Sequence, residues 1–349
     1  MCFFYLPQFD QTMILIKSPC FEAFTLSDKN IIFTGSRQEI IHSKKEFLNI
    51  IDLANFCIEP RRVNEVTEFI FNKNIDSEAL DYAIKNKILI NNHIDLSNRY
   101  SRNDIYLEYQ GIDSKSLRKK ISSMNILIAG CGGIGNIMSY NMVSLGAQNV
   151  LLLDDDTVEE SNLNRQVLFN ECDIGRKKVD VLEDRLTSIN STLKIKKIDS
   201  NLEKINLQSQ DISLIILSAD SENSLQIISK LATTNKIPLI SVGYLADISC
   251  IGPFYLPDIS SCPMCNNIYT DTNDEIDPRL KNINNHYKAP SAPMNNFLAA
   301  IMATNDIVNY ISGNETKIKS LNRRYGINSF TFEHDYIECP VSNNCQYCA

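Results

Sequence analysis

The sequence lacks three features that would each indicate a particular class of protein. No apolar run approaches membrane-spanning length. The first residues have no basic leader, and Pro7, Gln8 and Asp10 interrupt their apolar stretches, so we expect no signal peptide. Basic residues are not in excess: 34 Lys and Arg stand against 42 Asp and Glu, and the net charge of -8 disfavours a nucleic-acid partner. We therefore expect a cytoplasmic protein that contacts neither a membrane nor nucleic acid.

Histidine and disulfide patterns are also missing. The 4 histidines show no metal-ligand spacing, and no G-x-S-x-G nucleophile motif accompanies them. The 11 cysteines are an odd count without an export signal, which favours reduced thiols and metal ligation over a disulfide framework. A chain of 349 residues with 44% hydrophobic and 22% charged content can bury a full core, as one large domain with a smaller companion.

The chain divides into two parts by its patterns. Residues 1–96 alternate short apolar runs with helical stretches, such as residues 45–56 and 77–90, and predict a small α+β module without a catalytic motif. The polar stretch 91–104 reads as a linker into the main domain, residues 97–349.

The main domain alternates strand and helix patterns. Short apolar runs at 125–130, 149–156, 212–220 and 238–244 are typical of buried parallel strands, and helical stretches at 175–190 and 223–234 separate them. Shorter strand-like runs at 247–256 and 327–333 flank a long helix predicted from Pro293. We therefore predict an α/β fold: a doubly wound, mostly parallel Rossmann-like sheet with a C-terminal antiparallel part.

A glycine-rich turn follows the first of these strands and opens a helix. In this context a G-x-G-x-x-G motif is meaningful, because its glycines let the backbone approach a phosphate at the helix N-terminus. Asp154 ends the second strand, where a carboxylate can bind ribose hydroxyls. A nicotinamide dehydrogenase would show the same residues, so the motif predicts a nucleotide but not a reaction. The nucleotide-binding glycines are Gly130, Gly132, Gly133 and Gly135.

Polar residues after the second strand favour a triphosphate over a dinucleotide. Asn162, Arg165 and Lys178 add donors and cations to the carboxylates Asp154 and Asp156 near one strand end. Positioned Arg and Lys side chains stabilise the charge that develops when a carboxylate attacks an α-phosphorus and pyrophosphate departs.

A magnesium ligand is predicted at the end of the next strand. Asp220 ends the run 212–220, and its carboxylate could hold the Mg²⁺ that such a reaction usually requires. Read singly, each of these charged side chains is more often a solvated surface group. Read together, at the carboxyl ends of successive strands, they predict a catalytic site formed by Arg165, Lys178 and Asp220.

Two C-x-x-C pairs predict a structural zinc site. Each pair can place two thiolates on one tetrahedral ion, and four thiolates leave no open position for water. The metal would pin the C-terminal part to the body of the domain, with Cys339 as a spare ligand or a bystander. The four predicted ligands are Cys262, Cys265, Cys345 and Cys348.

The ordered pieces RYSRN, GCGGIG, DDDTVEESNLNRQ, GRKK and SAD resemble the motif set of the ThiF/MoeB/HesA family of adenylate-forming enzymes, over roughly residues 98–349. By this resemblance Asp154 binds the ribose of ATP, and Asp220 binds magnesium. It further implies that Asn162, Arg165 and Lys178 contact the phosphates. Arg102 in RYSRN matches an arginine that reaches into the partner subunit's active site, which implies a homodimer.

Within the family the chain resembles most the microcin C maturation enzymes. It has no cysteine between Cys265 and Cys339 for a thioester or acyl-disulfide step, and it carries the extra N-terminal module and the segment KAPSAPMNN. The resemblance implies that the module clamps a short ribosomal peptide ending in Asn, and that ATP supplies an AMP group joined through an N–P bond.

Three other functions remain open from the sequence. The first is an activator of the MoeB or ThiF kind, which adenylates the C-terminal Gly-Gly of a sulfur carrier protein. The second is a nicotinamide oxidoreductase, which has no use for Arg165, Lys178 and Asp220 together. The third is a peptide-binding module with a vestigial nucleotide site.

Overall fold

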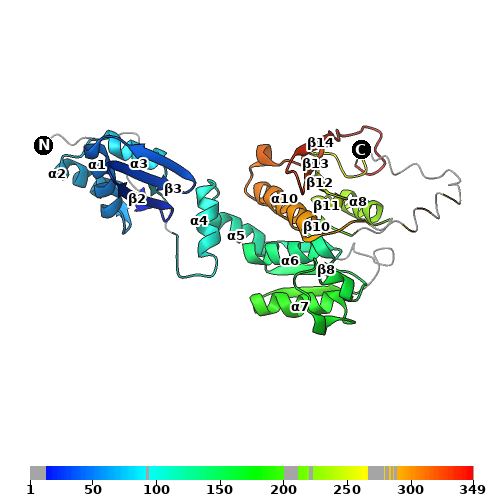
Figure 1. Cartoon of the computed structure of the whole chain (residues 1–349). Coiled ribbons are helices and arrows are strands. Elements are labelled where there is room, and N and C mark those ends of the chain that lie inside the picture. Colours follow the sequence, from blue (N-terminus) through cyan, green and yellow to red (C-terminus); the bar gives the residue numbers. More distant parts are fainter. Residues whose placement is uncertain are drawn as a thin grey trace. The chain divides into compact units, whose positions relative to one another are not determined.

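The structure is a computed structural model that describes residues 13–91, 94–199, 211–219, 223–265, 279, 283, 286 and 289–348. The chain divides into two compact units, Met1–Ser114 and Lys115–Ala349, which are described separately (Figure 1). Within the described ranges, no helix combines the length and the apolar character needed to cross a membrane.

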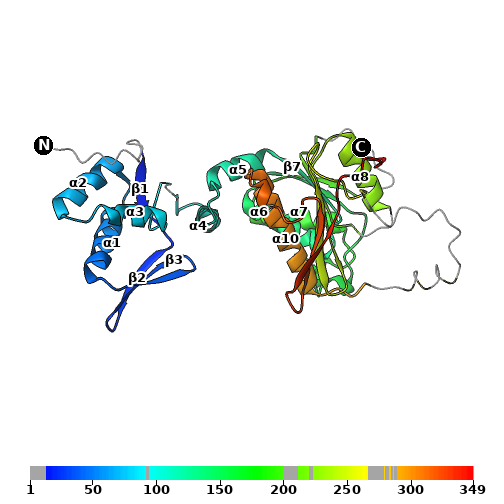
Figure 2. The same ribbon diagram turned by 90° about the horizontal axis from the view of Figure 1, so that it is seen from above.

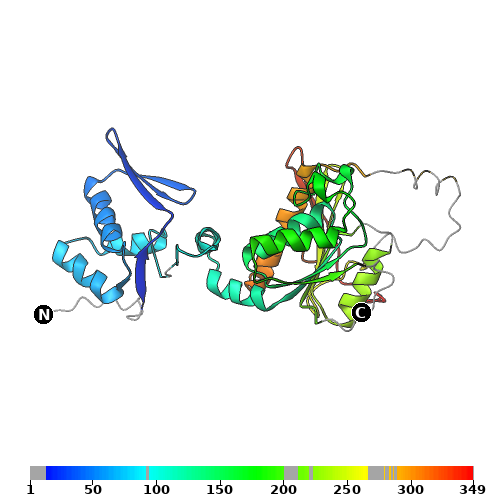
Figure 3. The same cartoon turned by 90° about the horizontal axis from the view of Figure 1, so that it is seen from below.

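The first unit is an α+β module. A three-stranded antiparallel sheet of β2 (Phe21–Leu26), β3 (Lys29–Thr34) and β4 (Arg37–Ile41) accompanies α1 (Lys44–Phe56), α2 (Val63–Lys73) and α3 (Glu78–Lys85), as Figure 3 shows. A short second sheet pairs β1 (Ile14–Lys17) with β5 (Arg61–Arg62) and β6 (Leu89–Ile90). The predicted α+β character of this module is confirmed.

The helices of the first unit begin and end where local residues require it. The Ser43 side chain accepts a hydrogen bond from the Glu46 amide and caps α1. Phe47 and Leu53 then face the core of the unit. The helical stretch predicted over 77–90 ends early at α3, because Lys87 adopts a left-handed φ of 56° and the chain turns into β6.

Helix α4 (Ser101–Tyr109) belongs to the first unit rather than to a linker. The Tyr109 hydroxyl accepts a hydrogen bond from the Ser36 amide at 3.2 Å, and Lys87 Nζ donates to the Tyr109 carbonyl at 2.6 Å. The stretch 91–104, which the sequence predicts to be a linker, thus includes the start of a helix at Ser101. The compact units divide between Ser114 and Lys115 rather than between the predicted residues 96 and 97, and contacts with Ser36 and Lys87 hold α4 to the first unit.

The second unit is built on one eight-stranded sheet with the strand order β14-β13-β12-β11-β10-β7-β8-β9. The five strands β7 (Asn125–Ala129), β8 (Asn149–Leu153), β9 (Lys194–Ile198), β10 (Leu214–Leu217) and β11 (Leu239–Leu245) are parallel. The strands β12 (Ile248–Tyr255), β13 (Arg323–Asn328) and β14 (His334–Glu338) continue the sheet antiparallel. The predicted fold class is confirmed.

Helices cover both faces of this sheet (Figure 2). Helices α6 (Gly133–Leu145), α7 (Lys178–Ile189) and α10 (Pro293–Ile311) lie on one face, and α8 (Ser224–Thr234) lies on the other. Helix α5 (Ser114–Ser123) precedes β7. Strand β7 is buried on both faces, as a central parallel strand should be, and its Leu127 packs with Ile228 of α8. The carboxyl ends of β7, β8 and β10 are thereby set beside the start of α6.

Two strand assignments differ from the sequence pattern. Strand β9, at the parallel edge of the sheet, was not predicted, because its KIKKI pattern exposes its lysines and lacks an apolar run. The predicted strand run 327–333 is wrong after Asn328. Residues 329–333 form the turn between β13 and β14, in which Phe332 has a φ of 61°.

Candidate functional site

The glycine loop lies between the end of β7 and the start of α6. Gly130 leaves the strand with a φ of 94°, a conformation that glycine adopts readily. Its amide donates to the carbonyl of Leu153 at 2.9 Å, which ties the loop to the end of β8. The free amides at the start of α6 therefore lie at the carboxyl edge of the sheet, where open α/β sheets bind ligands.

The four predicted glycines face different surroundings. A Cβ at Gly135 would lie 1.8 Å from the Gly130 carbonyl oxygen, and one at Gly130 would lie 2.6 Å from the Ala219 amide nitrogen. At Gly133 it would meet the side chain of Asn296 at 2.1 Å. At Gly132 it would meet nothing within 4 Å. Three glycines are therefore required by protein packing, and Gly132 marks the face of the loop that a phosphate can approach.

Asp154 holds the glycine loop from the end of β8. Its Oδ2 accepts from the Cys131 amide at 2.6 Å, and its Oδ1 accepts from the Asp156 amide at 2.9 Å. Burial raises the pKa of the Asp154 carboxyl, while nearby Lys178 and the two amides act in the opposite direction. Both oxygens keep further lone pairs, so the carboxylate can still accept hydrogen bonds from two ribose hydroxyls.

Lys178 forms the cationic side of the same site. It is the first residue of α7, and its Nζ lies 2.6 Å from Oδ2 of Asp156. The lysine side chain is only 7% exposed, whereas Asp156 is 66% exposed. A cation with so little water around it interacts strongly with any anion that reaches it. The structure thus brings Asp154, Asp156 and Lys178 together at one strand end.

The segment after β8 is folded on itself. Asn162 is buried, and its Oδ1 accepts from the Glu159 amide at 3.0 Å. The guanidinium of Arg165 donates to the carbonyl of Ser161 at 2.8 Å. Asn136 of α6 holds the far end of the segment, because its Oδ1 accepts from the Leu168 amide at 3.0 Å. Asn162 and Arg165 therefore lie in the segment that follows Asp154, with their side chains engaged locally.

Two predicted catalytic residues do not join this group of contacts. Arg102 is an exposed residue of α4 in the first unit, and no hydrogen bond or ion pair involves its side chain within the described residues. Asp220 lies outside the described residues, immediately after Ala219. The roles of both remain predictions.

Two asparagines at the start of α10 are not predicted as site residues by the sequence pattern. They belong to the KAPSAPMNN segment, and Asn296 is the residue that faces Gly133. Asn295 and Asn296 are both buried, at 4% and 1% exposure. The sequence signal for these two asparagines is their position in the first turn of the helix predicted from Pro293. Polar side chains at a helix start can supply the hydrogen-bond partners that its backbone needs.

The four predicted zinc ligands come together on the α8 face of the sheet. The Sγ atoms of Cys262 and Cys345 lie 3.6 Å apart, and those of Cys265 and Cys348 lie 3.3 Å apart. All four sulfurs lie within 4.8 Å of one another. Cys339 is not among them, and its amide donates instead to the carbonyl of Asn322.

The spacing of these sulfurs fits a tetrahedral zinc ion. Zn–S bonds of about 2.3 Å place sulfurs about 3.8 Å apart, close to the 3.9 Å between Cys262 and Cys265. Burial raises the pKa of the Cys262 thiol, so a bound cation would be needed to hold Cys262 as a thiolate. The cluster could therefore hold zinc, and with four sulfur ligands the ion would be structural.

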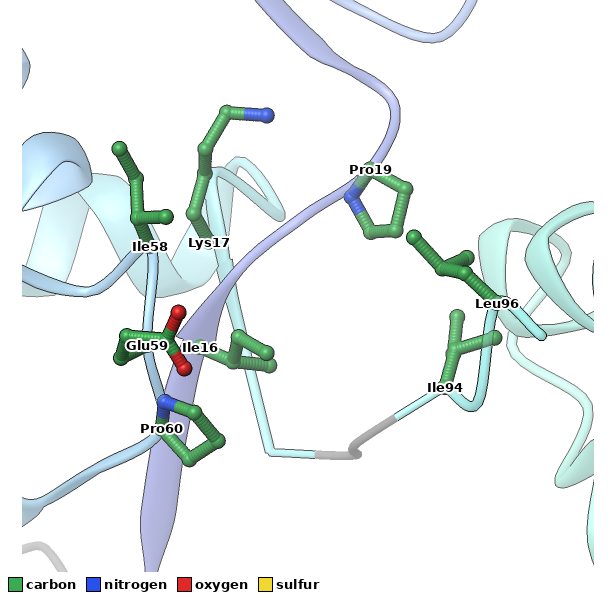
Figure 4. A pocket seen from close by; sticks show the side chains of 8 residues that line it. All are labelled: Ile16, Lys17, Pro19, Ile58, Glu59, Pro60, Ile94 and Leu96. Atoms are coloured by element: carbon green, nitrogen blue, oxygen red, sulfur yellow. The ribbon is translucent and has the colours of Figure 1, made fainter.

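A pocket of about 350 Å³ lies within the first unit. Figure 4 shows Pro19 and Leu96 on one side of it and Ile16, Glu59 and Pro60 on the other. Leu96 is 61% exposed, so its apolar side chain is accessible to a ligand in this pocket. The lining is thus mostly apolar with one carboxylate and one cation. The lining residues are Ile16, Lys17, Pro19, Ile58, Glu59, Pro60, Ile94 and Leu96.

The fold and the glycine-loop site define a class of protein. The model of the ThiF family matches residues 103–348, which is well over half of the chain. The chain therefore belongs to the ThiF family.

Solved structures narrow this class. The Escherichia coli MccB structure with ATP superimposes with a TM-score of 0.81 and 27% sequence identity, covering 97% of this chain and 100% of that one. The MccB structure with MccA-N7isoASN gives a TM-score of 0.80 and 28% identity, covering 96% of this chain and 99% of that one. The protein is similar to MccB over both of its units, as the sequence predicted.

Sequence relatives match a shorter part of the chain. The molybdopterin-synthase adenylyltransferase of Escherichia coli is 31% identical over 176 residues, which are 48% of this chain and 66% of the relative. The ThiS adenylyltransferase of Bacillus subtilis is 30% identical over 179 residues, 49% of this chain and 50% of the relative. The chain spans less than two thirds of the curated relatives that it matches first, between 14% and 66% of their length.

Proposed function

We propose that the protein is an ATP-dependent nucleotidyltransferase that activates the C-terminal residue of a short ribosomal peptide and leaves AMP attached through an N–P bond. Such a product belongs to the biosynthesis of microcin C-like antibiotics. The observation that carries this proposal is the match to MccB over 96–97% of the chain, N-terminal unit included. The relatives that act on sulfur carriers match only about half of the chain.

The glycine-loop site supplies the groups that this reaction needs. The amides around Gly132 would bind phosphate oxygens, and the Asp154 carboxylate would accept hydrogen bonds from the ribose. As a nucleophile on the peptide attacks the α-phosphorus and pyrophosphate leaves, the buried cation of Lys178 would stabilise the charge on the phosphoryl oxygens. Arg165 and Asn162 would assist if their local hydrogen bonds opened to the nucleotide.

Three further parts of the machinery are proposed from the sequence. Asp220 would hold the Mg²⁺ that neutralises the departing pyrophosphate. Arg102 would complete the site of a partner subunit in a homodimer. The cysteine cluster would hold zinc outside the chemistry, because four thiolates leave the ion no open position.

The pocket of the first unit is the proposed contact for the peptide. Its apolar walls suit a hydrophobic side chain. The Lys17 ammonium and the Glu59 carboxylate can pair with a peptide's charged groups or hydrogen-bond its backbone. This assignment gives the clamp role of the N-terminal module a defined surface.

The proposal is tested by incubating the protein with MgATP or MgCTP and peptides that end in Asn, Asp or Gln, followed by mass spectrometry. A nucleotidyl mass increment on the Asn peptide alone supports the proposed reaction. The second candidate function is adenylation of a carrier protein ending in Gly-Gly, which the match to the molybdopterin-synthase adenylyltransferase favours. Transfer to such a carrier, with no modified peptide, would establish that function instead.

The peptide contact is tested by Leu96→Asp. A charge on an apolar wall of the pocket should raise the KM for the peptide about tenfold and leave MgATP affinity unchanged. Leu48→Asp is the matched control, because Leu48 is a 47% exposed leucine of α1 that does not line the pocket. Equal effects of the two substitutions on the peptide KM would rule out this pocket.

A further inference from the structure

The start of α10 is fixed by a small network of asparagine side chains. The side-chain Nδ2 of Asn295 donates to the carbonyl of Ala246 at 2.8 Å, and the backbone carbonyl of Asn295 accepts from the Ser249 hydroxyl at 2.9 Å. The Asn295 Oδ1 also accepts from the Ala292 amide at 3.0 Å. The first turn of α10 is therefore tied to the β11–β12 hairpin before it reaches the glycine loop.

Asn296 is oriented by the same network. Its Nδ2 donates to the Ala292 carbonyl at 2.7 Å and lies 2.9 Å from both Ser291 Oγ and Asn295 Oδ1. A carboxamide has two N–H groups, so these three acceptors use its whole donor capacity. The reversed amide would set its oxygen against the Ala292 carbonyl and Asn295 Oδ1. The orientation of Asn296 is therefore determined by its hydrogen bonds.

This orientation directs the amide oxygen of Asn296 at the glycine loop. The three nearest atoms that a Cβ at Gly133 would meet all belong to Asn296: Oδ1 at 2.1 Å, Cγ at 2.9 Å and Nδ2 at 3.5 Å. The Asn296 side chain thus occupies the space that any side chain at position 133 would need. On the other side, the open face of Gly132 remains free for a phosphate.

We propose that Asn296 is a positioning residue of the phosphate-binding loop. Its amide fills the space at Gly133, and this contact fixes the peptide between Gly132 and Gly133 with its amides toward the nucleotide phosphates. The inference rests on the proposed function only in that the glycine loop binds a nucleotide.

The charge of residue 296 matters as much as its shape. The oxygen lies at the N-terminus of α6, where the helix dipole and the free amides attract negative charge. A neutral amide oxygen leaves that attraction available to phosphates. A carboxylate in the same place would occupy it and repel them, so we expect triphosphate binding to require an uncharged side chain at position 296.

The charge requirement is tested with Asn296→Asp by titrating MgATP and adenosine in separate calorimetric experiments. We expect the Kd for MgATP to rise about tenfold or more, because the new charge acts on the phosphates, and the Kd for adenosine to change less than about threefold. Asn305→Asp adds the same charge on an exposed position of α10 and should change neither Kd. Unchanged MgATP affinity, or equal losses for both ligands, would overturn the proposal.

The packing requirement is tested with a cycle of Gly133→Ala, Asn296→Ala and the double variant. Gly133→Ala alone should weaken MgATP binding, because the new Cβ displaces the Asn296 side chain. In the Asn296→Ala background the same change should cost at least about threefold less affinity, since the space is then open. Equal costs in the two backgrounds would show that Asn296 does not set the geometry of the loop.

Thermal unfolding of the same four proteins distinguishes a failure of the proposed nucleotidyltransferase function from a failure of the positioning role of Asn296. If the wild-type protein bound neither MgATP nor MgCTP, the proposed function would fail. The unfolding temperatures would still report the coupling between positions 133 and 296. Additive shifts of those temperatures would overturn the packing argument independently of any ligand.

Discussion

The two units hold their functional groups in opposite ways. In the second unit, hydrogen bonds of 2.6–2.9 Å join Asp154 to the glycine loop and to Asp156, and Asp156 forms a 2.6 Å ion pair with the buried Lys178. In the first unit half of the side chains that line the pocket are exposed, Leu96 and Ile58 among them. Chemistry requires groups fixed within fractions of an ångström, whereas peptide recognition can use an open apolar surface. The proposed function accordingly places catalysis in the second unit and peptide recognition in the first.

The largest expected effect comes from removing the buried cation. Lys178→Met should lower the rate of pyrophosphate release about 10²- to 10³-fold, because no other cation in the described site is so well shielded from water. Peptide binding by the first unit should not change. Lys177→Met is the matched control, since Lys177 is 38% exposed and pairs with Asp199 instead. A rate within a few-fold of wild type would contradict the separation of tasks.

Loss of the metal should affect only the second unit. Cys345→Ser should abolish stoichiometric zinc, measured by mass spectrometry of the metal, and lower the stability of that unit by several kcal/mol. Calorimetry should then resolve an unfolding transition of the first unit at an unchanged temperature. Cys339→Ser should retain the zinc. A chain that contains no zinc before mutation would disprove the metal assignment.

The pH dependence of nucleotide binding tests whether the Asp154 carboxylate of the second unit contacts the nucleotide. Burial raises the pKa of Asp154 above the ordinary value of an aspartate, so its carboxylate takes up a proton at a higher pH than an exposed aspartate does. Affinity for MgATP should therefore decrease, by about tenfold, as the pH falls through that raised pKa. Asp154→Asn, which cannot titrate, should bind weakly at every pH. A wild-type affinity that is flat over the same range would exclude Asp154 from ribose binding.

The smallest expected effect lies in the first unit. Tyr109→Phe removes the hydroxyl contacts with Ser36 and should slightly lower the unfolding temperature of this unit. MgATP affinity should stay at the wild-type value. Tyr106→Phe, on the same helix at 61% exposure, is the control. If the two variants unfolded at the same temperature, the Tyr109 hydroxyl would have no part in holding α4.

The sequence predicted the features that depend on short spacings. The glycine loop, Asp154 and the two C-x-x-C pairs are each defined by residues a few positions apart. The parallel sheet then places Asp154 beside the glycine loop, because both follow neighbouring strands. The strand β9 and the turn at 329–333 were missed, because edge strands and hairpins lack the apolar runs that identify central strands.

Contacts between distant segments could not be predicted in the same way. Nothing in the local sequence pairs Gly133 with Asn296, or Gly35 with the Tyr109 ring that a Cβ at Gly35 would meet. The local hydrogen bonds of Asn162 and Arg165 were also unforeseen, because capping of a 3₁₀ turn competes with ligand contact for the same side chains. Their predicted phosphate contacts remain predictions.

The cysteine cluster has a topological consequence. When a metal joins Cys262 to Cys345, the chain between them becomes a closed ring, and the start of α10 with Asn296 lies inside that ring. Closing a long ring removes many of the arrangements open to the unfolded chain, so a metal at this site would stabilise the folded state of the second unit without contacting the nucleotide. Stripping the metal with a chelator should therefore lower the unfolding temperature of the second unit.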